Sequence, residues 1–127
     1  MDVSRFFSAA AAVAIKKDDK RGHRIGAVAI RKDGAIVSAS NGGIQETAAE
    51  YLTVCADGKK RYPQAHAEVR LSRKLDAGSI VFICRVAGHG SYALAKPCRN
   101  CERVLRNKGV KKVYYTISNN EYGVILL

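Results

Sequence analysis

The sequence is poor in proline, aromatic residues and cysteine, and it contains no long hydrophobic run. Two prolines and 47% hydrophobic residues in 127 positions indicate one globular domain, residues 1–127, with its own core. An aromatic content of 7% leaves few rings on which a single strand of nucleic acid would stack. Four cysteines give no disulfide framework, which favours a reducing compartment, and the cytoplasm is the expected location.

The apolar segment at residues 6–15 superficially resembles the hydrophobic part of a signal peptide. Its basic flank is thin and it is rich in alanine instead of leucine, so we interpret it as a helix of the folded domain. The segment is also too short to span a bilayer, and no other apolar run approaches the necessary length. The sequence therefore predicts no membrane partner.

The charge of the chain is strongly positive, with 22 basic and 11 acidic residues and a net charge of +11. This excess favours an anionic partner, although a solvated basic surface without a partner is the simpler alternative. Nucleotide phosphates and a nucleic-acid backbone both satisfy the charge, which by itself does not separate them.

Two cysteines, Cys98 and Cys101, stand at the start of a predicted helix that follows Pro97. The i, i+3 spacing places both sulfur atoms on one face of the first turn, as is typical of metal ligands. The partial positive charge of a helix N-terminus lowers the pKa of nearby thiols toward the thiolate that a metal binds. A disulfide between the two is disfavoured because they lie within one helical turn.

His66, followed by Glu68 at the head of another predicted helix, supplies a third ligand. One imidazole and two thiolates neutralise Zn²⁺, and three protein ligands leave the fourth position for water, as in catalytic zinc sites. Zinc lowers the pKa of such a water to about 7, and the Glu68 carboxylate can then carry its proton to a leaving amine. The alternative is a closed structural zinc site, which leaves Glu68 without a role and takes its fourth ligand from His23, His89, Cys55 or Cys84.

Periodicity and turn residues predict alternating helices and strands. Helices are expected at residues 4–17, 66–75 and 98–107, with a further short helix at 46–54, and strands at 25–30, 35–40, 79–86, 110–118 and 122–127. The link before the last strand is too short for a crossover, so that strand is expected to be antiparallel to its predecessor. This order predicts an α/β fold, a three-layer α/β/α sandwich with a five-stranded mixed sheet.

Together, His66-Ala67-Glu68 and Pro97-Cys98-Arg99-Asn100-Cys101 resemble the signature of the zinc-dependent cytidine and deoxycytidylate deaminase superfamily. The resemblance implies the same fold over nearly the whole chain and association into homo-oligomers. It also implies that the backbone amide of Ala67 binds the base and that Asn41 contacts the sugar, although asparagine is also common in turns. In the loop at residues 87–96, Tyr92 is a candidate for stacking on a base.

The predicted function is hydrolytic deamination of cytosine to uracil, with Zn²⁺ as cofactor and a cytidine or deoxycytidine nucleotide or nucleoside as substrate. One alternative is a deaminase that acts on cytosine or adenine in single-stranded DNA or RNA. The other is a basic module without catalytic activity that contains zinc and binds nucleic acid.

Overall fold

The computed structural model describes residues 2–15, 24–41, 53–54, 60–61 and 67–127. Helices and strands alternate along these residues in the manner of an α/β protein. In chain order they are α1 (Val3–Ile15), β1 (Arg24–Ile30), β2 (Ile36–Ser40), β3 (Thr53–Val54), β4 (Lys60–Arg61), α2 (Ala67–Ser72), β5 (Ile80–Val86), β6 (Tyr92–Ala93), α3 (Arg99–Asn107), β7 (Lys112–Thr116) and β8 (Tyr122–Leu126).

The main sheet has the strand order β2-β1-β5-β7-β8. Strands β5 and β7 are parallel, whereas the pairs β1–β2, β1–β5 and β7–β8 are antiparallel, so the sheet is mixed. The predicted antiparallel partnership of the last two strands is confirmed. The short strand β6 is a sixth member that the sequence did not predict, and it pairs with β5 just past the residues that pair with β7.

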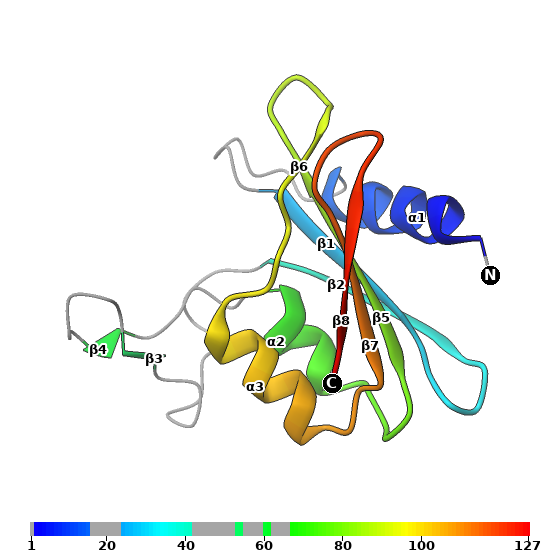
Figure 1. The fold of residues 1–127 in the computed structure, drawn as a ribbon, viewed down its shortest axis with the longest axis vertical. Coiled ribbons are helices and arrows are strands. Elements are labelled where there is room, and N and C mark those ends of the chain that lie inside the picture. Colours follow the sequence, from blue (N-terminus) through cyan, green and yellow to red (C-terminus); the bar gives the residue numbers. More distant parts are fainter. Residues whose placement is uncertain (1, 16–23, 42–52, 55–59, 62–66) are drawn as a thin grey trace.

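Helices cover both faces of this sheet, which confirms the predicted three layers (Figure 1). Helix α1 lies on one face, over β1 and β5, and buries a cluster that includes Phe7, Phe82 and Cys84. Helices α2 and α3 lie on the other face, where Leu71 and Leu105 pack against residues of β1, β5 and β7. No helix in the described part of the chain is long and apolar enough to cross a membrane.

Strand β5 is central, and its side chains alternate between the two layers. Val81 and Ile83 belong to the cluster beneath α2 and α3, whereas Phe82 and Val86 belong to the cluster beneath α1. The residues of a strand that are buried on both faces are apolar, as the run at residues 80–84 indicated. On the neighbouring strand, Gly26 allows the close approach of α1, because a Cβ atom there would collide with the backbone of Ala10.

Two element predictions were wrong in detail. Helix α2 ends at Ser72 and does not reach residue 75, because Lys74 and Leu75 donate their N–H groups three residues back, to Leu71 and Ser72, instead of four. The suggested helix at residues 46–54 includes residues 53–54, which are a strand paired with β4, and its other residues lie outside the described part. Pairing between distant residues decides such short strands, and local sequence does not carry that information.

Candidate active site

Helix α3 begins one residue later than predicted, with Cys98 as its N-cap. The backbone N–H of Cys101 donates to Sγ of Cys98 over 3.5 Å, so the first thiol caps the helix that carries the second. Cys98 is exposed and Cys101 is fully buried, and both are at the positively polarised end of α3. Pro97 therefore precedes the N-cap instead of occupying the first helical position.

Helix α2 begins with Ala67, and Glu68 is its second residue. Ala67 is fully buried and the Glu68 side chain is only 4% exposed. A carboxylate so far removed from water is costly unless it has polar or charged partners, which makes Glu68 the most unusual acidic residue of the described chain. The preceding residue, His66, lies outside the described residues.

The two helix starts meet at Cys101. The pKa of the Cys101 thiol is raised by a hydrogen bond with Cys98, by burial and by the negative charge of Glu68. These three causes place Cys98, Cys101 and Glu68 in one site. For Cys101 the hydrogen bond with Cys98, burial and the charge of Glu68 act in the direction opposite to that expected from the helix N-terminus.

The donor set fits a divalent metal. Two thiolates and a carboxylate in contact would repel one another strongly, and a cation such as Zn²⁺ is the kind of partner that allows the thiols to lose their protons. Among the described residues no group of three or more His, Cys, Asp or Glu side chains is arranged to hold a metal. The third proposed ligand, His66, is not among them, so the geometry of the complete ligand set stays a prediction.

The place of this site relative to the sheet follows from two hydrogen bonds, one made by α2 and one made just after its end. Nη1 of Arg70 donates to the carbonyl oxygen of Ser40 over 3.2 Å, and Nζ of Lys74, one turn later, donates to that of Ser38 over 2.7 Å. Helix α2 therefore runs antiparallel to β2. Its first residues, Ala67 and Glu68, lie near the carboxyl end of β2, where Asn41 follows the last residue of the strand.

Asn41 is anchored to β1 from both its backbone and its side chain. Its N–H donates to the carbonyl oxygen of Ile25 over 3.1 Å, and its Oδ1 accepts the N–H of Ile25 over 3.2 Å. The side chain thereby replaces a backbone acceptor where the strand ladder ends. This cross-strand role differs from the turn role given as the alternative, and the sugar contact of Asn41 stays a prediction.

The structure does not bring Tyr92 to this site, which corrects its expected place. Strand β6 pairs Tyr92 with Val86, and both side chains therefore lie on the face of the sheet that packs against α1. Tyr92 lines a cavity of about 210 Å³ together with Phe7 and Tyr122, and burial raises the pKa of its hydroxyl. The cysteines and Glu68 are on the opposite side of the sheet. Local sequence did not reveal β6 and so did not reveal this face.

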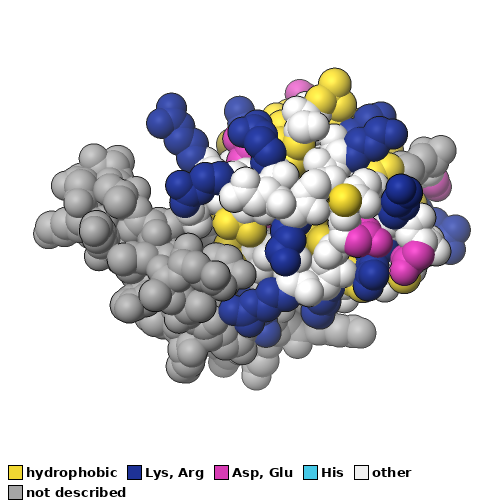
Figure 2. Space-filling model, turned by 90° about the horizontal axis from the view of Figure 1, so that it is seen from below, with side chains coloured by type: hydrophobic (Ala, Val, Ile, Leu, Met, Phe, Trp, Pro, Cys, Tyr) yellow, Lys and Arg dark blue, Asp and Glu magenta, His cyan; other side chains and the backbone are white. Residues whose placement is uncertain are grey.

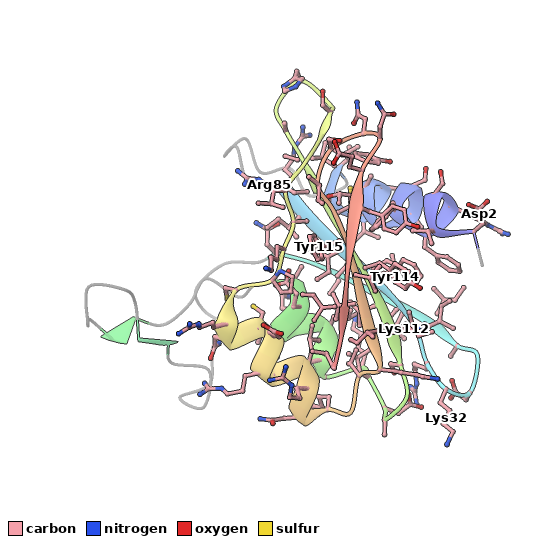
Figure 3. All side chains as sticks on the ribbon, in the orientation of Figure 1. Asp2, Lys32, Arg85, Lys112, Tyr114 and Tyr115 are labelled. Atoms are coloured by element: carbon pink, nitrogen blue, oxygen red, sulfur yellow. The ribbon has the colours of Figure 1, made fainter. Side chains whose placement is uncertain are left out.

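One basic residue at the site edge of the sheet was not singled out from the sequence. Arg85 lies next to the last residue of β5, and Figure 3 shows it far from Lys32 and Lys112, which lie toward the opposite end of the sheet. The sequence did contain a signal for this residue, because Arg85 is the only charged residue in the strand Ile80–Val86.

The protein is thus an α/β/α sandwich in which two thiols at the start of α3 lie beside a buried carboxylate at the start of α2. The sequence model of the cytidine and deoxycytidylate deaminase zinc-binding region matches residues 1–117. That match spans most of the chain, so the protein belongs to this family, and the resemblance read from the two motifs is confirmed. A search of the curated proteins found no match to the sequence.

Solved structures of deaminases share the fold. A cytidine deaminase from Burkholderia pseudomallei is 16% identical, with a TM-score of 0.62 over 99% of this chain and 93% of that one. The dCMP deaminase of cyanophage S-TIM5, in apo form, is 21% identical, with a TM-score of 0.54 over 91% and 82% of the two chains. A cytidine deaminase from Mycobacterium tuberculosis is also 21% identical, with a TM-score of 0.53 over 91% and 85%. At such identities the likeness establishes the fold alone.

Proposed function

We propose that this protein is a zinc-dependent hydrolase that converts cytosine to uracil in a cytidine or deoxycytidine nucleotide or nucleoside. The observation that carries the proposal is the meeting of Cys98, Cys101 and the buried Glu68 at two helix starts. A structural zinc site needs no buried carboxylate beside its thiols, whereas a hydrolytic site needs a group that moves protons. Membership of the deaminase family supports the same reaction.

In the proposed site His66, Cys98 and Cys101 would hold Zn²⁺. When bound, zinc supplies a Lewis acid that makes a water acidic enough to act as a nucleophile near neutral pH. Glu68 would accept one proton from that water and pass it to ring N3, and would then carry the remaining proton of the hydroxyl added at C4 to the amine that leaves. A C4–O bond forms, the C4–N bond breaks and ammonia departs.

Substrate binding would fall to groups at the same edge of the sheet. Ala67 is the first residue of α2, so its N–H has no acceptor four residues back within the helix and is proposed to bind the base. Asn41, held by Ile25 through Oδ1, is proposed to present its Nδ2 group to the sugar. Both residues lie at the N-terminal end of α2 and the carboxyl end of β2.

A second candidate substrate is cytosine in a single-stranded nucleic acid, which the net charge of +11 favours. Over the described part of the visible face, Figure 2 shows Lys and Arg side chains that are scattered and do not form one continuous stripe. A strand-binding surface requires a track of several cations, whereas a mononucleotide requires one or two. We therefore favour the free nucleotide.

The test is ammonia release from dCMP, CMP, deoxycytidine, cytidine and a cytosine-containing single-stranded oligonucleotide, each measured at two salt concentrations. Turnover of the monomeric substrates is expected. For a strand-binding enzyme the affinity would fall with a log–log salt slope of about −0.7 per phosphate contact. Turnover of the oligonucleotide alone, with a steep loss at high salt, would establish the second candidate. No ammonia from any substrate by protein that contains zinc would remove the enzymatic proposal.

A further inference from the structure

We infer that Arg85 binds the 5′-phosphate of the substrate, so that the preferred substrate is a cytosine nucleoside monophosphate. This inference rests on the proposed function and assigns the anionic part of the ligand to one residue. Six of the seven residues of the central strand β5 are uncharged, and the remaining one, Arg85, is a half-buried arginine.

The face on which Arg85 lies follows from the alternation of β5. Val81 and Ile83 pack beneath α2 and α3, and Arg85 is the next residue of that row. Phe82, Cys84 and Val86 take the α1 face. The Arg85 side chain therefore projects from the face of the sheet that carries Glu68, Cys98 and Cys101.

The register places Arg85 close to the groups proposed for the sugar. Ile25 is paired with Arg85 on one side and holds Asn41 through two hydrogen bonds on the other. Asn41, Ile25 and Arg85 thus form one row across β2, β1 and β5. Neighbouring strands are about 4.8 Å apart, so Asn41 and Arg85 are separated by roughly 10 Å of sheet. An arginine side chain at this spacing can reach a phosphate attached to a sugar that Asn41 contacts.

The position along the strand also favours a ligand. Strands β5 and β7 are parallel, and Arg85 lies at the carboxyl end of β5. Crevices outside the carboxyl ends of parallel strands are where α/β proteins bind ligands. The planar guanidinium suits a phosphate because it can donate two parallel hydrogen bonds.

Arg24 provides a matched control. It is paired with Val86, one position further along the same ladder, so its side chain projects from the opposite face of the sheet. Its Nη2 donates to the carbonyl oxygen of Ala87 over 3.0 Å. Arg24→Gln and Arg85→Gln therefore each remove one positive charge, from neighbouring residue pairs of the β1–β5 ladder and from opposite faces of the sheet.

The experiment compares kcat/KM for dCMP and deoxycytidine, and for CMP and cytidine, in the wild type and both variants. Arg85→Gln is expected to lower kcat/KM for the monophosphates about 10- to 100-fold, as for loss of a charge-assisted hydrogen bond, and to change the nucleosides less than about 2-fold. Arg24→Gln is expected to leave both unchanged. Binding of dUMP and deoxyuridine, followed by calorimetry, gives a readout without turnover, in which only dUMP should lose affinity in Arg85→Gln.

Three results would overturn the inference. Equal losses for nucleotide and nucleoside in Arg85→Gln would mean that Arg85 supports Glu68 or the site as a whole. Deamination of deoxycytidine without preference for dCMP would reject the phosphate contact and leave the proposed function standing. Turnover of the oligonucleotide alone would reject a nucleoside monophosphate as the substrate. Conversely, Arg85-dependent binding of dUMP without any turnover would support the phosphate contact and remove the proposed function.

Discussion

The side-chain oxygen Oδ1 of Asn41 accepts the N–H of Ile25 over 3.2 Å, and this bond fixes the orientation of the Asn41 amide. Since Oδ1 has to face that N–H, Nδ2 is directed elsewhere. The structural role and the proposed sugar contact therefore use different ends of one side chain, and substitution can separate them.

Asn41→Asp keeps an acceptor for Ile25 but replaces the Nδ2 donor by oxygen. We expect a nearly unchanged free energy of unfolding and a KM raised about 10-fold, the worth of one hydrogen bond. Asn41→Ala removes both ends and should also lower the free energy of unfolding by about 0.5–1.5 kcal/mol. Denaturant unfolding and steady-state kinetics measure the two effects. If both variants keep the wild-type KM, the role of Asn41 is limited to its bonds with Ile25.

Glu68→Gln tests the proton carrier better than a change to alanine, because the side chain is only 4% exposed and truncation would leave a cavity. The amide has nearly the same shape but accepts no proton. We expect kcat to fall about 10²- to 10⁴-fold, as for the loss of a general acid–base group, with zinc content retained. Ammonia release and metal analysis on one preparation check this. Turnover near the wild-type rate would exclude Glu68 from proton transfer.

Cys98→Ser and Cys84→Ser form a pair that tests the ligand set. Cys84 is fully buried beneath α1, on the opposite side of the sheet from the proposed site, and burial raises its pKa to about 11. We expect about one zinc per chain in the wild type and in Cys84→Ser. Cys98→Ser should lose most of the metal and melt at a lower temperature. X-ray absorption that showed four protein ligands and no open position would favour a structural zinc instead.

Asp76 predicts an acid-dependent part of the stability. A hydrogen bond from Ser79, the backbone N–H of Lys32 and the charge of Arg31 lower the pKa of Asp76 below its ordinary value of 3.8. A carboxyl whose pKa is lowered by folding stabilises the protein above the unfolded pKa, and this stabilisation is lost as the pH falls through the folded value. Asp76→Ala should therefore lower the melting temperature at pH 7.

The difference between Asp76→Ala and the wild type should shrink as the pH falls below 3.8, where the carboxyl of the unfolded chain becomes protonated. Melting curves at a series of pH values from neutral to acidic measure it. A difference that stays constant down to strongly acidic pH would assign the effect to packing instead of charge.

The sequence by itself determined the local parts of this protein. The spacing of Cys98 and Cys101 after Pro97 predicted a helix start with two thiols on one turn, because neighbours along a helix are set by its pitch. The apolar run of β5 predicted a central strand, and the short link at residues 118–121 predicted the antiparallel β8. These features depend on residues that are close along the chain.

Only the tertiary structure decided which side chains share a face. Pairing of β6 with β5 sends Tyr92 to the α1 layer, away from the cysteines, and the register of β1 with β5 aligns Arg85 with Asn41. The contact of Glu68 with Cys101 joins two helices, and it adds to the hydrogen bond with Cys98 and to burial in raising the pKa of the Cys101 thiol. Such relationships arise between residues far apart in the chain, and because successive residues of a strand point to opposite faces, a shift of one residue in register would exchange them all.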